Sequence, residues 1–145
     1  MNLIFGRKKP RGFSPIKEAN IFSHPNFFNK DYNFQKLNTF FRTFQSYELE
    51  IGFGIGENLI NQAKLKPRTG FIACDPHLRG HFEVLSFIAN SKVKNILLSN
   101  LSFEDLRQYL QKNLSNVYIL FPDPWPKMKH RKRRLINGLF VMELS

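Results

Sequence analysis

The sequence predicts an α/β protein built on an open parallel sheet. Three observations lead to this prediction. From Tyr47 onward, short apolar runs of strand length alternate with longer stretches of helical periodicity. Strands that alternate with helices pair in parallel, because each helix carries the chain back across the sheet in a right-handed βαβ unit. Glycine or polar residues follow each apolar run, at the ends of the strands where such sheets bind ligands.

The composition is that of a basic globular domain. The chain has 145 residues, 42% of them hydrophobic, which is enough for one domain with a core. Its formal net charge of +11 favours a polyanionic partner or an acidic membrane surface, with nucleic acid as the first candidate. No apolar run reaches about 18 residues and no secretory signal opens the chain, so neither membrane insertion nor export is expected. The single cysteine, Cys74, excludes an internal disulfide and a multi-cysteine metal site, so we expect no metal and a cytoplasmic location.

Residues 1–46 are expected to form an N-terminal region of their own. Basic residues lie among Gly and Pro in residues 1–17, a composition typical of a mobile arm. Five apolar residues then recur at steps of three and four: Phe34, Leu37, Phe40, Phe41 and Phe44. This spacing predicts an amphipathic helix with its aromatic face on the core; a base-stacking surface is the less favoured alternative.

Residues 47–145 are expected to form the sheet and its helices. The predicted buried strands cover residues 47–52, 70–75, 95–100 and 116–123. The predicted helices cover residues 57–65, 78–89 and 103–112. The apolar sequence of residues 135–145 predicts one more helix, whose apolar side chains we expect to be exposed.

The first strand runs into the sequence EIGFGIGEN, where Gly52, Gly54 and Gly56 alternate just before a helix. Glycines there allow a tight turn and a close approach to a ligand, and the helix offers unpaired N–H groups to an anionic group. A purely steric role is the alternative. Asp75 ends the second strand 19 residues after Gly56, near the offset of about 20 at which a carboxylate meets ribose hydroxyls. The spacing Gly-x-Gly-x-Gly favours S-adenosylmethionine over a dinucleotide, which weakens an oxidoreductase interpretation.

The third and fourth strands also end in polar residues. Asn100 follows the third, and Asp123 follows the fourth. Either residue alone is most simply an exposed loop group. Because the carboxyl ends of parallel strands share one edge of the sheet, we expect both to join the glycines and Asp75 in a single ligand site.

Three segments, LEIGFGIGENL, GFIACDPHLRG and LFPDPWPKMKHRKRRLI, resemble the bacterial tRNA (guanine-N7-)-methyltransferases over residues 47–136. The most specific part is FPDPWPK followed by HRKRR. The resemblance implies a Rossmann-like class I methyltransferase sheet, S-adenosylmethionine as methyl donor, and methylation of a variable-loop guanine in tRNA.

The resemblance also implies roles for individual residues. It makes Glu50, Asp75 and Asp123 cofactor contacts, and Asp123 the catalytic residue beside the substrate. Asn100 stands where the family usually has Asp, and Asp75 where it usually has Glu. The predicted cofactor-binding residues are Glu50, Gly52, Gly54, Gly56, Asp75, Asn100 and Asp123.

The basic residues after Asp123 are expected to contact RNA. Lys127 matches a substrate-contacting lysine of the family. Six Lys and Arg with no acid occupy residues 127–134, and such a run favours contact with phosphates over a merely solvated helix face. The predicted substrate-binding residues are Lys127, Arg131, Arg133 and Arg134. Trp125 is expected to pack under the loop, with stacking on a base as the alternative.

The resemblance further implies that the sheet is incomplete at the C-terminus, because a class I methyltransferase sheet has further strands beyond the fourth. Residues 116–123 are then expected to lie at an exposed edge. Two functions stay open: a methyltransferase completed by a complementary C-terminal polypeptide, and a non-catalytic remnant that binds tRNA.

Overall fold

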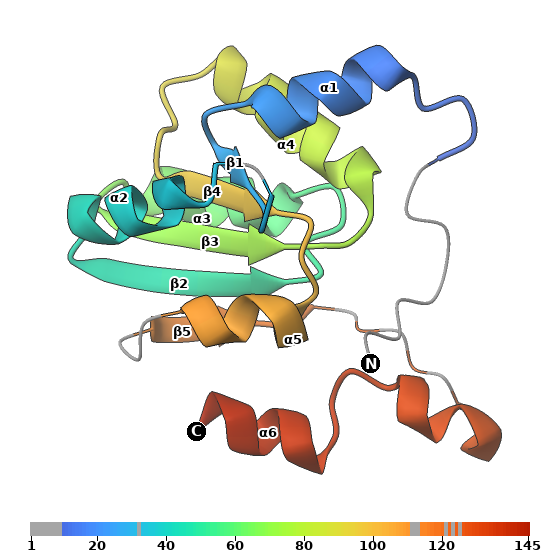
Figure 1. Cartoon of the computed structure of the whole chain (residues 1–145). Coiled ribbons are helices and arrows are strands. Elements are labelled where there is room, and N and C mark those ends of the chain that lie inside the picture. Colours follow the sequence, from blue (N-terminus) through green and yellow to red (C-terminus); the bar gives the residue numbers. More distant parts are fainter. Residues whose placement is uncertain (1–9, 32, 111–113, 121, 123, 125) are drawn as a thin grey trace.

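The structure is a computed structural model that describes residues 10–31, 33–110, 114–120, 122, 124 and 126–145. Its parallel strands form one sheet in the order β1-β4-β3-β2-β5 (Figure 1). The strands are β1 Phe27–Phe28, β2 Ser46–Ile51, β3 Thr69–Cys74, β4 Ile96–Ser99 and β5 Leu114–Tyr118. The predicted parallel sheet is therefore confirmed.

Helices cover both faces of this sheet (Figure 1). The α-helices are α1 Pro15–Ser23, α2 Gln35–Thr43, α3 Glu57–Leu65, α4 Leu78–Ala89, α5 Phe103–Leu106 and α6 Gly138–Leu144. Two 3-10 helices are η1 Arg107–Tyr109 and η2 Met128–Arg133. Buried side chains of α2 and α5 pack on one face, whereas those of α1, α3 and α4 pack on the other.

Strand β2 shows how alternation divides the two faces. Tyr47, Leu49 and Ile51 belong to the core under α2 and α5. Glu48 and Glu50 point to the opposite face, where both hydrogen-bond to residues of the α3 region. Two carboxylates of one strand are thus buried on the same face, each only 3% exposed.

The predicted helices at 57–65 and 78–89 coincide with α3 and α4. The Phe-rich helix is confirmed as α2, which buries Leu37, Phe40 and Phe41. The helix predicted over 103–112 is shorter than expected, because a 3-10 turn follows α5 at Arg107.

Two N-terminal elements were not predicted. Helix α1 begins at Pro15, inside the segment assigned to a mobile arm, and the Ser14 side chain caps it by accepting from the Lys17 N–H at 3.2 Å. The short strand β1 adds Phe27 and Phe28 beside β4. Residues 1–9 of the predicted arm lie outside the described residues.

The strand predicted as buried over 116–123 is corrected in both extent and burial. Strand β5 covers residues 114–118, none of which is buried. Among the described strands it pairs only with β2, so it lies at the edge of the sheet. Its half-exposed Leu114 and Val117 pack on the core under α5.

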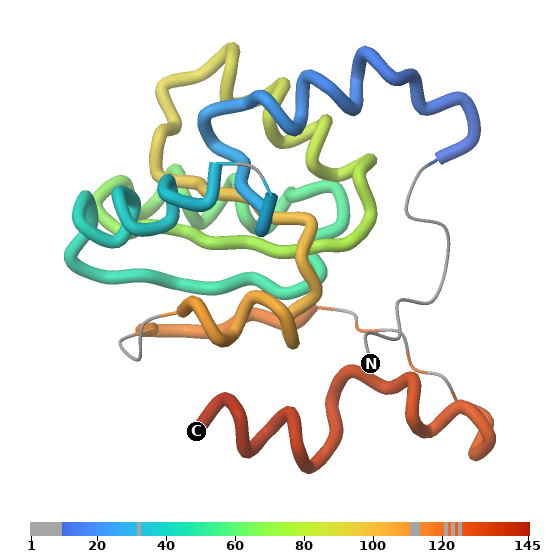
Figure 2. Tube along the Cα trace, viewed as in Figure 1, coloured from blue at the N-terminus to red at the C-terminus, as the bar shows by residue number. Residues whose placement is uncertain are grey.

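The C-terminal helix α6 lies beside α5 at the side of the sheet where β5 runs (Figure 2). The Phe140 ring is buried and packs edge-on against Phe103 with ring centroids 5.0 Å apart. Arg107 Nη1 pairs with Glu143 Oε1 at 3.1 Å. The exposed apolar surface predicted here is present at Ile136, Leu139, Val141 and Met142, whereas Phe140 is buried and Leu135 is half-buried against the core.

Candidate functional site

The carboxyl ends of β2, β3 and β4 stop at one level. Ile51 pairs with Cys74, and Cys74 pairs with Ser99. The next residues of the three strands, Gly52, Asp75 and Asn100, therefore stand side by side at one edge. Two backbone bonds hold this edge: Gly52 N–H to the Cys74 carbonyl at 2.8 Å, and Asp75 N–H to the Ser99 carbonyl at 3.1 Å. The edge predicted from the sequence as a ligand site thus brings these residues together.

The glycines after β2 have different roles. All three have positive φ, and a Cβ at Gly52 or Gly54 would meet nothing within 4 Å. Gly56 is buried, and a Cβ there would lie 2.2 Å from Val84 Cγ2. Space for a ligand thus lies at Gly52 and Gly54, whereas Gly56 allows the α3 and α4 helices to pack closely.

Helix α4 approaches the glycine loop through Gly80. A Cβ at Gly80 would lie 1.6 Å from the Gly54 carbonyl oxygen, so only glycine fits. The residue before α3 is Gly56, which provides no side-chain cap. Gly56 therefore caps none of the first-turn N–H groups of α3, and a helix start of this kind suits an anionic or polar ligand.

Asp75 holds the glycine loop with its side chain. Gly54 N–H donates to Asp75 Oδ2 at 3.2 Å, and His77 N–H donates to Oδ1 at 2.9 Å. His77 Nδ1 lies 3.0 Å from the same Oδ1. A carboxylate accepts about four hydrogen bonds. Since the His77 side chain is 45% exposed, it can turn away and leave room for ligand hydroxyls.

Glu50 has a less complete set of partners. Among the described residues its carboxylate accepts one hydrogen bond, from Asn58 Nδ2 at 3.2 Å. Burial raises the pKa of Glu50, and the bond from Asn58 offsets this only in part. A buried carboxylate with spare acceptor capacity stands to gain from a ligand donor such as an ammonium or a hydroxyl group.

His81 hydrogen-bonds to the backbone of Asp75. Its Nε2 lies 2.7 Å from the Asp75 carbonyl oxygen, which requires the tautomer that carries its proton on Nε2. The rings of Phe27 and Phe53 pack edge-on against it. Burial lowers the pKa of His81 to about 4, so the imidazole is neutral at physiological pH.

Residues 45–145 match the protein family described as "Putative methyltransferase". The chain belongs to this methyltransferase family. A tRNA (guanine-N(7)-)-methyltransferase of Zymomonas mobilis is 46% identical over 91 residues, which cover 62% of this chain and 39% of that protein. One of Wolbachia pipientis is 43% identical over 101 residues, 67% of this chain and 44% of that protein. The chain spans about 40% of the length of these relatives.

One further relative and one solved structure also match this chain. A "Bifunctional methyltransferase" of Rickettsia prowazekii is 47% identical over 90 residues, which cover 61% of this chain and 17% of that protein. The solved "Structure of an antibiotic related Methyltransferase" superimposes with a TM-score of 0.55 at 23% identity, over 61% of this chain and 46% of that one. The predicted methyltransferase fold class and the resemblance to tRNA (guanine-N7-)-methyltransferases are confirmed.

The remaining predicted residues lie after β4 or β5. Asn100 is half-buried at the carboxyl end of β4. Asp123 and Trp125 lie outside the described residues, so their predicted roles stay predictions. Among the described residues, no group of three or more His, Cys, Asp or Glu is placed to hold a metal ion. The described helices include none with the length and apolar content to cross a membrane.

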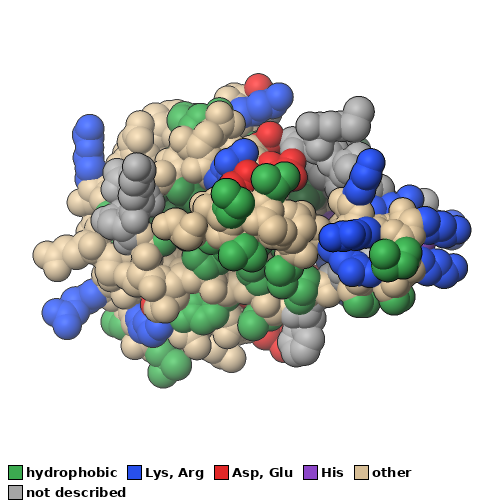
Figure 3. Space-filling model, turned by 90° about the horizontal axis from the view of Figure 1, so that it is seen from below, with side chains coloured by type: hydrophobic (Ala, Val, Ile, Leu, Met, Phe, Trp, Pro, Cys, Tyr) green, Lys and Arg blue, Asp and Glu red, His purple; other side chains and the backbone are tan. Residues whose placement is uncertain are grey.

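The predicted substrate-binding residues lie in and next to η2. Lys127, Arg131 and Arg133 are exposed, and Arg134 donates from Nη2 to the Pro126 carbonyl at 3.3 Å. Basic side chains gather at one end of the face seen in Figure 3, next to hydrophobic ones. Arg134 therefore shapes the turn, while Lys127 and Arg131 present charge to solvent.

Sequence reasoning missed Asn58, His77 and Gly80, which also contact residues of the candidate site. A glycine inside a predicted helix is a usable signal, because it costs stability unless close packing requires it. Asn58 gave a weaker signal as a polar residue in the first turn after the glycines. His77 was visible within the quoted segment GFIACDPHLRG but carried no predicted role.

Proposed function

We propose that this chain carries the S-adenosylmethionine site of a tRNA (guanine-N7-)-methyltransferase. The observation that supports this most is the edge where Glu50 and Asp75, two buried carboxylates, flank the open positions at Gly52 and Gly54. The names of the relatives from Zymomonas and Wolbachia point to the same activity. A cytoplasmic location is part of the proposal, since tRNA is its substrate.

The residues at the edge fit this cofactor. Asp75 would accept from the ribose hydroxyls once the His77 ring turns away, and Glu50 would accept from the amino group of the methionine part. Asn100 would hydrogen-bond the adenine through an amide that both donates and accepts. Open space at Gly52 and Gly54 would admit the ligand close to the backbone. S-adenosylmethionine, when bound, supplies an electrophilic methyl group.

Little further chemistry is required of the protein. Guanine N7 has an in-plane lone pair, so no base has to remove a proton before it attacks. Positioning the two reactants can account for about 7–11 kcal/mol of barrier lowering. We propose that Asp123 orients the purine by accepting from its N–H edge, and that its charge favours the cationic product.

The basic segment would bring the RNA to this edge. Lys127, Arg131 and Arg133 are exposed, and the sequence of residues 127–134 contains no acid. They would neutralise phosphates near the guanine. Because this releases counterions from the RNA, binding should weaken as the salt concentration rises. Arg134 would hold the turn through the Pro126 carbonyl and contact RNA with its remaining donors.

We also propose that further strands pair with β5. They would be supplied either by additional sequence of the same polypeptide or by a separate partner chain. Strand β5 has one described neighbour and no buried residue, and an exposed strand edge pairs readily with another strand. The exposed side chains of Leu139 and Met142 on α6 would be covered in the same way.

The proposal is tested by measuring tRNA binding and methyl transfer separately. We expect Asp123→Asn to bind unmodified tRNA like the wild type but to transfer no labelled methyl group from S-adenosylmethionine. The double variant Lys127→Glu/Arg131→Glu is expected to bind tRNA more weakly, with a salt slope lower by about 2. Lys92→Glu/Lys94→Glu is the matched control, because it makes the same change of charge at exposed positions between α4 and β4.

Each alternative gives a different result in these assays. The non-catalytic RNA-binding function is supported if the wild-type chain binds tRNA but not S-adenosylmethionine, and if no methyl group is transferred even when the complementary polypeptide is supplied. Equal loss of tRNA binding in the control and in the test variant would contradict the role of the basic segment.

A further inference from the structure

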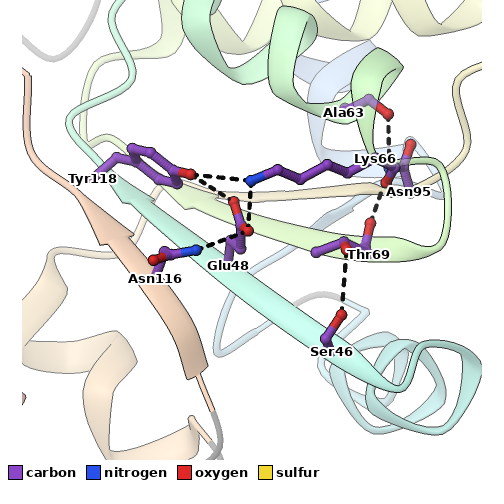
Figure 4. Close-up of polar contacts among 8 residues, drawn as sticks. All are labelled: Ser46, Glu48, Ala63, Lys66, Thr69, Asn95, Asn116 and Tyr118. Atoms are coloured by element: carbon purple, nitrogen blue, oxygen red, sulfur yellow. Dashed lines mark hydrogen bonds and ion pairs between the residues drawn. The ribbon is translucent and has the colours of Figure 1, made fainter.

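A buried carboxylate joins β2, the end of α3 and β5 (Figure 4). Glu48 Oε1 accepts from Lys66 Nζ at 2.8 Å and from Asn116 Nδ2 at 3.0 Å. Glu48 Oε2 accepts from the Tyr118 hydroxyl at 2.8 Å, and Lys66 Nζ lies 3.4 Å from that hydroxyl oxygen. We call these four residues the Glu48 cluster. Glu48 lies two residues nearer the amino end of β2 than Glu50, and Tyr118 of the cluster stands opposite Glu50.

The pairing of β5 with β2 is irregular just where the cluster begins. Tyr47 pairs with Leu114, whereas Glu48 pairs with Asn116, so Ser115 is an extra residue in β5. None of residues 114–118 is buried. A strand with little burial has a weakly specified register, and β5 therefore needs another source of alignment.

The Glu48 cluster supplies that alignment. Asn116 stands opposite Glu48, and Tyr118 stands opposite Glu50, so both side chains project toward the same face of the sheet. A slip of one residue would turn both away and leave the buried carboxylate with Lys66 alone.

Lys66 is itself held in place by a buried asparagine. The Asn95 side chain donates from Nδ2 to the carbonyls of Ala63, Lys66 and Thr69 at 3.1, 3.0 and 2.9 Å. These contacts fix the turn between α3 and β3 that carries the lysine (Figure 4). Asn116 and Tyr118 thus belong to β5, and Lys66 is held by the turn after α3.

We propose that the Glu48 cluster is a positioning device: it sets the register of β5 and thereby the position of Pro122, Pro124 and Lys127 relative to the glycine loop. The chain runs on from β5 into these residues. A slip of one residue would move them by about 3.3 Å along the strand. The effect on RNA binding rests on the proposed function, whereas the effect on register does not.

The register is tested first on the ligand-free chain by NMR. We expect Tyr118→Phe and Glu48→Ala to speed amide exchange at Val117 about tenfold or more and to weaken the cross-strand NOEs between Leu49 and Val117. Tyr109→Phe is the matched control, because that tyrosine lies in η1, outside the cluster. Unchanged exchange and NOEs in Tyr118→Phe would overturn the proposal, even if Glu48→Ala failed to fold.

The second readout is tRNA affinity by filter binding. We expect Tyr118→Phe to bind tRNA about threefold or more weakly than Tyr109→Phe, because a displaced Lys127 loses a phosphate contact. A disturbed β5 with unchanged tRNA affinity would overturn the positioning role. Failure of the wild-type chain to bind S-adenosylmethionine would contradict the proposed function but not the register.

Discussion

Glu48 and Glu50 stand two residues apart on the same face of β2, and their surroundings differ. Burial opposes the ionisation of Glu48, but hydrogen bonds from Lys66, Asn116 and Tyr118 outweigh it and lower its pKa. Burial raises the pKa of Glu50, against a single bond from Asn58. Glu48, nearer the amino end, thus accepts hydrogen bonds from three protein side chains. Glu50, nearer the carboxyl end, can still accept hydrogen bonds from a ligand.

The same contrast holds for the backbone at the two ends. The amino end is tied to β5 and to the turn after α3 by side chains. The carboxyl end opens into a loop with space at Gly52 and Gly54. One strand therefore combines a fixed end with an end that can receive a cofactor, as sites in open α/β sheets generally do.

The largest effect is expected from a substitution that overpacks the glycine loop at the carboxyl end of β2. Gly80→Ala would place a Cβ 1.6 Å from the Gly54 carbonyl oxygen, which is backbone and cannot move aside alone. We expect a loss of about 3 kcal/mol of stability by urea unfolding, and loss of S-adenosylmethionine binding. Gly138→Ala in α6, where a Cβ meets nothing within 4 Å, is the matched control and should be nearly neutral. Equal stability of the two variants would show that α4 does not constrain the loop.

Removing Asp75 tests the ligand capacity of the carboxyl end. Asp75→Ala deletes an acceptor for ribose hydroxyls and the support of the Gly54 N–H. We expect calorimetry to show S-adenosylmethionine binding weakened by about 1.5–3 kcal/mol. The exposed Asp31→Ala is the control. Binding equal to the wild type in Asp75→Ala would remove Asp75 from the site.

Neutralising each glutamate should shift stability in opposite directions. Glu48→Gln is expected to destabilise the fold at pH 7 by about 1–2 kcal/mol, because its three partners favour the charged form. Glu50→Gln should leave stability unchanged or raise it, because burial disfavours the charge there. Glu104→Gln, exposed on α5, should stay within about 0.5 kcal/mol. Destabilisation of the same size at Glu50 would contradict the comparison.

The smallest effect is the pH dependence of these two variants. The raised pKa of Glu50 means that the folded chain gains stability as the pH falls toward the ordinary value of 4.5 and loses it as the pH rises. The lowered pKa of Glu48 means that its stabilising contribution is present above 4.5 and is lost as the pH falls below it. The measurement is the urea unfolding midpoint of the wild type minus that of each Gln variant, at pH values from 7 to 3. This difference should rise toward low pH for Glu50 and fall below pH 4.5 for Glu48. Profiles of the same sign for both glutamates would refute the assignment.

The helices and the inner strands were predictable because their signals are local. The apolar runs ending at Ile51, Cys74 and Ser99 each gave a strand to within about a residue, and the glycines and Asp75 marked the candidate cofactor edge. Helix α1 escaped prediction because basic residues, Gly and Pro around it suggested an arm, although Ser14 and Pro15 are a regular helix start. Strand β1 is two residues long, which is too short to show an alternation of apolar and polar residues.

The polar contacts were not predictable because they join distant residues. Glu48 meets Asn116 and Tyr118 only because β5 pairs with β2, 68 and 70 residues away in the chain. Burial of β5 was overestimated for a related reason: the apolar composition of residues 116–123 does not say which strands will flank it. Composition indicates a strand, whereas its neighbours decide how buried it is.

The most direct measurement is an NMR titration of the labelled chain with S-adenosylmethionine. The account predicts saturable shifts of the amides of Gly52, Gly54 and Asp75 at the carboxyl edge. It also predicts that the amides of Glu48 and Asn116 at the other end stay in place. Shifts centred on Glu48 and Asn116, or no saturable shift at the carboxyl edge, would contradict the assignment of that edge as the cofactor site.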